Sequence, residues 1–364
     1  MVSLPCCIYH HKRYESYLNL FFFLEDGAQV PLLDQRIQGI EDPSLKEKAG
    51  TLPELLNAAC ANSTLRKYKP AWQKWREWAS QFNEVSYCPA DPFFVAVYLN
   101  DLTSSNATEG AITAAVMGIR WGHRNSGFNS PTDNPLVKLA LEGSKRLIAA
   151  RNPVAKQNRK EPITSDLLKA IVDEYRTTEN LMDIRFVLMT VLGFCGFLRI
   201  SEMLEIQIKD ISFCEDGVKI FLPFSKTDQV REGSTVFISE TFSDYCPVCW
   251  LQKYLYHSKL QKPEDFLFCR LFKCKIGHSA HGHLKISYTT ARESFKLHLS
   301  NIVANTKDYG LHSLRSGGAT EAANNGVTDR MISKHGRWSS NTSRNTYIKD
   351  CHKKRFNVSK SLGI

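Results

Sequence analysis

The sequence lacks any apolar run of the roughly 20 residues that a membrane-spanning helix requires. The apolar stretch Tyr17–Leu24 is too short to cross a bilayer, and no small-residue cleavage site follows it cleanly. The 11 cysteines are odd in number and irregularly spaced, which argues against a disulfide framework and favours free thiols in a reducing compartment. We therefore expect an intracellular protein without a membrane partner, nuclear if its source is eukaryotic.

Negative charge is scarce relative to positive charge. The chain has 47 Lys and Arg against 37 Asp and Glu, a formal net charge of +10. Such an excess favours a polyanionic partner, either nucleic acid or an acidic membrane surface, although a merely basic soluble protein has the same balance. Hydrophobic residues make up 43% of the 364 positions, enough for real cores, and this length predicts two or three domains.

Metal-ligand patterns are also sparse. The chain contains no His-x-Glu sequence, which a nucleic-acid deaminase would combine with Pro-Cys-x-x-Cys. One Cys-x-x-Cys pair is present at Cys246 and Cys249, with irregularly spaced cysteines and histidines between residues 269 and 283. A zinc site is the alternative interpretation, but the pair fits the start of a helix better. We expect no metal and no other cofactor.

Helical periodicity dominates residues 51–155. Apolar residues there recur at three- and four-residue steps, which predicts a small all-α domain of four or five helices. Trp72, Trp75 and Trp78 share this spacing, which favours the core over a base-stacking surface. Residues 1–50 stay unassigned, as an extension or one helix lying on the next domain. The expected helices cover residues 63–82, 91–102, 108–124 and 136–150.

Basic side chains gather near the end of one expected helix and in the segment after the helical domain. Arg120 and Arg124 either favour the negative end of a helix dipole or face phosphate. Two prolines and few apolar residues mark residues 151–162 as a linker. A basic linker is well placed to cross a DNA backbone, and the alternative is a solvated hinge. Its basic residues are Arg151, Lys156, Arg159 and Lys160.

The pattern changes after Ile163, so we expect a second, mixed domain over residues 156–364. Two β-branched, alternating segments read as strands, and the stretch between them, residues 224–233, predicts a hairpin loop that carries Lys226. Helices are expected to resume from Cys249. The second domain should therefore be mostly helical with a small antiparallel sheet. Its first helices and strands are expected at 167–175, 181–194, 217–223 and 234–239.

Two pairs of polar residues have helical i, i+3 spacing. His312 and Arg315 lie on one helix face, so both side chains can point at one site. Arg199 follows a long apolar run, and a partly buried arginine needs an anionic partner. Glu202 either orients Arg199 towards a phosphate or forms a purely structural pair with it.

The remaining candidates come near the end of the chain. Tyr347 follows Trp338 by nine residues, and Ser339-Ser340 can cap a short helix that contains the tyrosine. Together with Lys226, the candidates form the set that metal-free phosphoryl transfer from DNA requires. Two guanidinium groups hold a phosphate, an imidazole and an ammonium handle the protons, and a phenol attacks.

This ordered set resembles the catalytic pattern of the tyrosine recombinase (phage integrase) superfamily. The matching motifs are Gly-Phe-Leu-Arg-Ile-Ser-Glu, Ser-Lys-Thr, His-Ser-Leu-Arg-Ser-Gly-Gly-Ala-Thr and Gly-Arg-Trp, followed by the tyrosine. The resemblance covers roughly residues 51–350 and implies an all-α core-binding (SAM-like) domain before an α+β catalytic domain. Trp338 takes a place that is usually histidine. The sequences of these motifs are similar to those of recombinases from eukaryotic mobile elements of the DIRS and Crypton types.

The resemblance implies that Tyr347 attacks a scissile phosphate and leaves a 3′-phosphotyrosine, with His312 and Lys226 moving protons. It implies that Arg199 and Arg315 clamp the phosphate, that neither metal nor ATP is needed, and that four protomers assemble on two sites of double-stranded DNA. Two alternatives remain open, a type IB topoisomerase-like enzyme and a domesticated DNA-binding protein with the fold but no activity.

Overall fold

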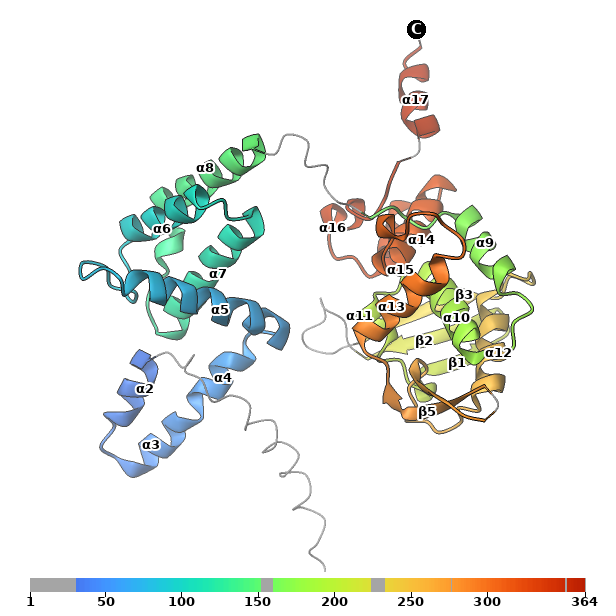
Figure 1. Ribbon diagram of the computed structural model, residues 1–364, viewed down its shortest axis with the longest axis horizontal. Coiled ribbons are helices and arrows are strands. Elements are labelled where there is room, and N and C mark those ends of the chain that lie inside the picture. The colour runs from blue at the N-terminus through green and yellow to red at the C-terminus, as the bar shows by residue number, and fades with distance from the viewer. Residues whose placement is uncertain (1–30, 152–159, 224–232, 276, 351, 364) are drawn as a thin grey trace, which may run out of the picture. The chain divides into compact units, whose positions relative to one another are not determined.

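The computed structural model describes residues 31–151, 160–223, 233–275, 277–350 and 352–363. The chain divides into two units, residues 1–156 and 157–364 (Figure 1). Three residues of the predicted site, Lys156, Arg159 and Lys226, lie outside the described residues. None of the described helices is both long and apolar enough to cross a membrane.

Every described element of the first unit is helical (Figure 1). The four helices expected from periodicity are present, and two of them start with a polar cap: the side chains of Asp91 and Thr108 accept hydrogen bonds from Phe93 N and Ala111 N. Between residues 31 and 50, which were left unassigned, the structure describes two short helices. The elements are α2 (Pro31–Gln38), α3 (Pro43–Gly50), α4 (Leu52–Ala58), α5 (Asn62–Ala79), α6 (Pro92–Ser104), α7 (Glu109–Asn125), η1 (Pro131–Asp133) and α8 (Pro135–Arg151).

Tryptophans form the centre of this unit. Trp72 and Trp75 have 0% exposed surface, and Trp78 is half-buried against the same cluster, as the helical spacing predicts. Helix α7 approaches α5 closely because Gly118 and Gly122 carry no side chain. A Cβ on Gly118 would lie 2.7 Å from Ala71 Cβ and 2.8 Å from the Trp72 backbone nitrogen.

We predict that Gly118→Ala destabilises the first unit by about 2 kcal/mol, because the new methyl group forces α5 and α7 apart. Gly143→Ala is the matched control, since a Cβ there meets no atom within 4 Å and the substitution favours α8. Tryptophan fluorescence during thermal unfolding of the intact chain measures both changes. Equal melting temperatures for the two variants would contradict the packing argument.

The second unit combines helices with two small antiparallel sheets (Figure 1). The helices are α9 (Ser165–Glu174), α10 (Leu181–Cys195), α11 (Ile200–Met203), η2 (Ile208–Asp210), α12 (Pro247–Ser258), α13 (Tyr288–Leu299), η3 (Thr306–Asp308), α14 (His312–Asn324), α15 (Asp329–Gly336), α16 (Asn341–Asn345) and α17 (His352–Lys360). The strands are β1 (Ile211–Cys214), β2 (Gly217–Leu222), β3 (Ser234–Ser239), β4 (Cys269–Lys273) and β5 (His278–Lys285).

Helix α10 is the central element of this unit. It is apolar all round, so nearly every residue from Leu181 to Gly193 is buried, as a helix covered on all sides requires. It packs against α12 and α14, and it ends at Cys195. Arg199 follows four residues later, so this core helix fixes the position of the first predicted arginine.

The sheets correct part of the sequence prediction. The expected strands β2 and β3 pair antiparallel, from Gly217 with Ser239 to Leu222 with Ser234. Helices do not simply resume from Cys249: α12 starts at Pro247, and the β4–β5 hairpin follows it. β5 reads His-Ser-Ala-His-Gly-His-Leu-Lys and is largely exposed, so it lacks the apolar alternation that predicts a strand.

Candidate active site

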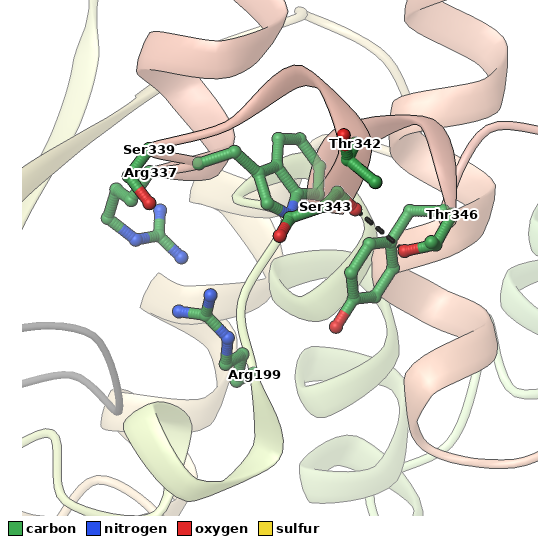
Figure 2. A pocket seen from close by; sticks show the side chains of 8 residues that line it. Arg199, Arg337, Ser339, Thr342, Ser343 and Thr346 are labelled. Atoms are coloured by element: carbon green, nitrogen blue, oxygen red, sulfur yellow. Dashed lines mark hydrogen bonds between the residues drawn. The ribbon is translucent and has the colours of Figure 1, made fainter. Parts of the chain in front are cut away.

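Two separate parts of the second unit line one pocket of about 400 Å³ (Figure 2). Arg199 comes from the segment after α10, and the other lining residues come from the chain between the end of α15 and Tyr347. Figure 2 shows the guanidinium groups of Arg199 and Arg337 facing each other, with Thr346 across the pocket. The lining residues are Arg199, Arg337, Trp338, Ser339, Thr342, Ser343, Thr346 and Tyr347.

A single buried carboxylate links two arginines of this site. Glu202, whose side chain is 1% exposed, lies 2.5 Å from Arg199 Nη1 and accepts a 2.8 Å hydrogen bond from Arg337 Nη2. It also accepts a 3.0 Å hydrogen bond from the Arg199 backbone nitrogen at the start of α11. These contacts hold Arg199 at the edge of the pocket, which is compatible with both roles expected for Glu202.

The electrostatic balance around Glu202 favours its ionised form. Burial alone raises the pKa of Glu202, but the charges of Arg337 and Arg199 and the hydrogen bonds from Arg199 more than offset this effect. The pKa of this carboxyl group therefore lies below its ordinary value. The carboxylate stays charged at neutral pH and neutralises only part of the positive charge around it.

Sequence reasoning missed Arg337. Its backbone is left-handed, with φ of +58°, at the residue that ends α15, and its side chain donates to Phe197 O at 3.1 Å and His335 O at 2.8 Å. The only available signal was its place directly before Trp338, because a left-handed arginine cannot be read from residue type. Arg337 supplies the third guanidinium group of the site.

Arg315 is fully buried behind the pocket, with 0% exposure. It donates to the backbone oxygens of Phe197 and Gly336, and its guanidinium lies 4.3 Å from the Trp338 ring and 5.1 Å from the Tyr347 ring. Burial and the neighbouring charges of Arg199 and Arg337 lower the pKa of Arg315 to about 9. A bound anion would relieve this repulsion, so the site is built to accept one.

Trp338 packs in the same cluster as Tyr347. Its ring centre lies 5.3 Å from that of Tyr347, and it is 8% exposed. Its indole Nε1 is buried and has no hydrogen-bond partner among the described residues. An unpaired buried donor is costly, and this one belongs to a residue that lines the pocket. It is therefore available to an oxygen atom bound there.

Tyr347 lies outside the short helix that was expected to contain it. Ser340 caps that helix as expected, but α16 ends at Asn345, and Tyr347 follows the C-cap residue Thr346. A five-residue helix is too short to be stable alone, so its extent depends on contacts rather than on local pattern.

His312 is exposed and begins α14, one helical turn before Arg315. The structure thus brings Arg199, Arg315, Trp338 and Tyr347 together.

Four of the basic residues expected to contact DNA lie among the described residues, and each has a partner within the protein. Arg120 pairs with Asp133 at 2.6 Å, and Arg151 donates to Thr103 O at 2.6 Å near the end of α6. Lys160 donates to Lys307 O. The side chain of Arg124 is 65% exposed and 3.9 Å from Asp133, so it is more accessible than that of Arg120, which is 28% exposed. Their contacts with DNA stay a prediction.

The Cys-x-x-Cys pair starts a helix, as expected. Cys246 is the residue before α12, and Pro247 occupies the first helical position. The Glu240 carboxylate and the thiols of Cys246 and Cys249 lie within 4.8 Å of one another. Three such groups are fewer than the four ligands of a structural zinc site.

The pocket lined by Arg199, Arg337 and Tyr347 has a different chemistry. A pocket that favours an anion and lies beside a phenol is what a tyrosine-dependent phosphoryl-transfer enzyme requires.

Comparison with known proteins gives the family. The phage integrase family matches residues 161–354, more than half of the chain. The integrase/recombinase XerD homolog of Selenomonas ruminantium is 27% identical over 317 residues, which cover 86% of this chain and 87% of that protein. Recombinase Cre of Escherichia phage P1 is 25% identical over 297 residues, 76% of this chain and 81% of Cre. The chain therefore belongs to the phage integrase family, the tyrosine recombinases.

Solved structures show the same fold. The XerH recombinase bound to its difH substrate before cleavage aligns with a TM-score of 0.52 at 15% identity, over 92% of this chain and 94% of XerH. A lambda integrase dimer bound to a core site aligns with a TM-score of 0.50 at 13% identity, over 93% of this chain and 85% of that protein. The expected fold class, mostly helical with small antiparallel sheets, is thus confirmed.

We predict that Glu202→Gln lowers the free energy of unfolding by about 3 kcal/mol at pH 7, because Arg199 and Arg337 lose their buried counter-charge. The pKa of Glu202 is lowered by folding, so its ionised form stabilises the protein above pH ~4. This stabilisation is lost as pH falls through the folded-state pKa. The difference in free energy of unfolding between wild type and variant should therefore shrink at low pH, as measured by denaturant unfolding between pH 3 and 8.

Glu205→Gln is the matched control for this experiment. Glu205 pairs with Lys285, but its side chain is 27% exposed and that of Lys285 is 45% exposed. Such pairs contribute about 0–1 kcal/mol, so this variant should unfold almost like the wild type. A Glu202→Gln deficit that stays constant from pH 7 to 3 would contradict the assigned electrostatics.

Proposed function

We propose that this tyrosine recombinase cuts and rejoins double-stranded DNA at specific sites through a covalent bond between Tyr347 and the 3′ side of the cut. The observation that carries the proposal is the convergence of Arg199, Arg315 and Tyr347 around one positively charged pocket. Two of the solved structures with this fold are described as bound to a DNA substrate and to a core site, which supports DNA as the partner.

The reaction transfers a phosphoryl group by replacing one phosphate ester bond with another. The bond between the Tyr347 phenol oxygen and phosphorus forms as the bond from phosphorus to the 5′ oxygen breaks. Free tyrosine has a pKa near ~10, so the phenol needs help to lose its proton. We assign the acceptance of that proton to His312, with nearby guanidinium charges favouring the phenolate.

The phosphate itself is held by cations and one indole. Arg199 and Arg315 neutralise the non-bridging oxygens as negative charge develops, and Trp338 donates its free N–H to one of them. Lys226 protonates the leaving 5′ oxygen as the general acid. It belongs to the segment between β2 and β3. The phosphotyrosine conserves the bond energy, so resealing needs neither ATP nor a metal.

We predict that Tyr347→Phe abolishes the covalent protein–DNA adduct, because phenylalanine offers no nucleophile. DNA fragments that become covalently bound to the wild-type protein are first selected and sequenced. The adduct is then measured on a nicked suicide duplex that carries the selected site. Tyr256→Phe is the control, since Tyr256 is 80% exposed on α12 and should leave the adduct unchanged.

The adduct assay, together with an assay on supercoiled DNA, separates the alternative functions. Persistence of the adduct in Tyr347→Phe would refute the assigned nucleophile. DNA binding without any wild-type adduct would identify a domesticated DNA-binding protein. Relaxation of supercoiled DNA by the monomer, with no strand exchange, would identify a topoisomerase-like activity.

We further propose that residues 51–155 form the core-binding domain and residues 156–364 the catalytic domain, and that both contact the DNA. The exposed Arg124 and the basic linker would contribute phosphate contacts, so that affinity falls steeply with salt. Two motifs support an origin in a eukaryotic DIRS- or Crypton-type mobile element, and hence action in the nucleus. They are His-Ser-Leu-Arg-Ser-Gly-Gly-Ala-Thr and Gly-Arg-Trp. Terminal repeats flanking the coding sequence would test that origin.

We propose that four protomers assemble on two DNA sites, with the chain after Tyr347 packing on a neighbouring protomer. Helix α17 supports this, because Phe356 and Val358 are 65% and 67% exposed and have the apolar character of a buried interface. Truncation at residue 352 should weaken assembly more than single-site binding, as measured by gel shift with one-site and two-site duplexes. Equal loss in both assays would count against this role of α17.

A further inference from the structure

Two hydroxyl groups of α14 hold the backbone of the tyrosine segment. Ser316 Oγ donates a 2.5 Å hydrogen bond to the carbonyl oxygen of Tyr347. Thr320 Oγ1 donates to the same oxygen at 3.3 Å and accepts a 3.0 Å hydrogen bond from Lys349 N. The bonds fix both the carbonyl of the tyrosine and the amide two residues later, so the segment is held in position and in direction.

A second anchor lies on the other side of the tyrosine. Arg344 is 5% exposed, and it pairs with Asp329 at 2.8 Å and donates to Ser333 Oγ at 3.2 Å, both on α15. Tyr347 N in turn donates to Arg344 O at 2.9 Å. The chain is thus tied to α15 before the tyrosine and to α14 after it, although α16 has only five residues.

Helix α14 is itself unable to shift. A Cβ on Gly317 would lie 2.0 Å from Ile163 O, and one on Gly318 would lie 2.1 Å from Phe194 O, so the helix backbone touches its neighbours directly. Arg315 lies on this helix, next to Ser316 in sequence. The two hydroxyls therefore connect the tyrosine to the same rigid element that carries a phosphate-binding arginine.

We propose that Ser316 and Thr320 are positioning residues, which set the Tyr347 phenol at the correct distance and angle to the phosphate held beside Arg315. This inference rests on the proposed function of Tyr347 as the nucleophile. The two hydroxyls touch neither the phosphate nor the leaving group.

Their loss should slow the attack by the phenol and leave DNA binding unchanged. A misplacement of about 1 Å costs about 100-fold in rate when two reacting groups must meet in line. We expect the double variant Ser316→Ala/Thr320→Val to form the adduct about 100-fold more slowly than the wild type. The readout is the single-turnover rate on the selected suicide duplex, with affinity measured separately on the uncut duplex.

Conservative substitutions separate positioning from folding. Thr320→Val keeps the shape of the side chain and removes the hydroxyl, whereas Thr320→Ser keeps the hydroxyl and should restore most of the rate. Thr190→Val is the matched control, because that buried hydroxyl donates only to Phe186 O within α10. If Thr320→Ser reacts as slowly as Thr320→Val, the role of the hydroxyl is refuted.

A changed leaving group tests which step the hydroxyls affect. A duplex with sulfur in place of the scissile 5′ oxygen releases a thiolate, which needs no protonation. It should rescue Lys226→Ala but not the double variant, whose defect lies in the attack. Rescue of both variants would overturn the assignment of Ser316 and Thr320 to nucleophile positioning.

Hydrogen exchange gives a readout that does not depend on catalysis. The Lys349 amide donates to Thr320, so its exchange should be protected in the wild type and in Thr320→Ser and faster in Thr320→Val. A wild type that forms no adduct with any DNA overturns the proposed function and, with it, the positioning role. A wild type that reacts while the double variant matches it within twofold overturns the positioning role alone.

Discussion

The carboxylate of Glu202 is the interaction on which the site depends. Arg199 and Arg337 flank it, and Arg315 is lowered in pKa first by its burial and then by the charges of these two arginines. One buried anion therefore serves three guanidinium groups, which keeps them close together and leaves the pocket with uncompensated positive charge. A phosphate diester adds the missing negative charge, so the arrangement that strains the empty protein is the one that favours its substrate.

The two predicted phosphate-binding arginines are attached to well-packed elements. Arg199 follows the largely buried helix α10, and Arg315 lies within α14, whose glycines press against neighbouring backbone. The phenol of Tyr347 belongs to a short segment that packs against Trp338 and is held to α14 by hydrogen bonds. Packed support for the phosphate site and hydrogen-bonded support for the nucleophile match the demands of a tyrosine that must alternate between free and covalently bound states.

Periodicity predicted the helices of the first unit and the strands β2 and β3, because there apolar residues face a core at regular steps. It failed for β5, whose histidines and glycine carry no such pattern, and for the end of α16, which is set by the contacts of Arg344 with another helix. The candidate residues were found through their order along the chain, while Arg337 was missed because its role depends on a left-handed backbone and a distant carboxylate.

The close approach of α14 to its neighbours limits how this protein can evolve. At Gly317 and Gly318 there is no space for even one methyl group, so these two positions tolerate almost no substitution. Helix α13 carries exposed side chains such as Tyr288 and Leu297, whose substitution meets no such packing constraint. Sequence change in this lineage is therefore expected to gather at exposed positions of this kind, while the packed helix that carries Arg315 stays nearly constant.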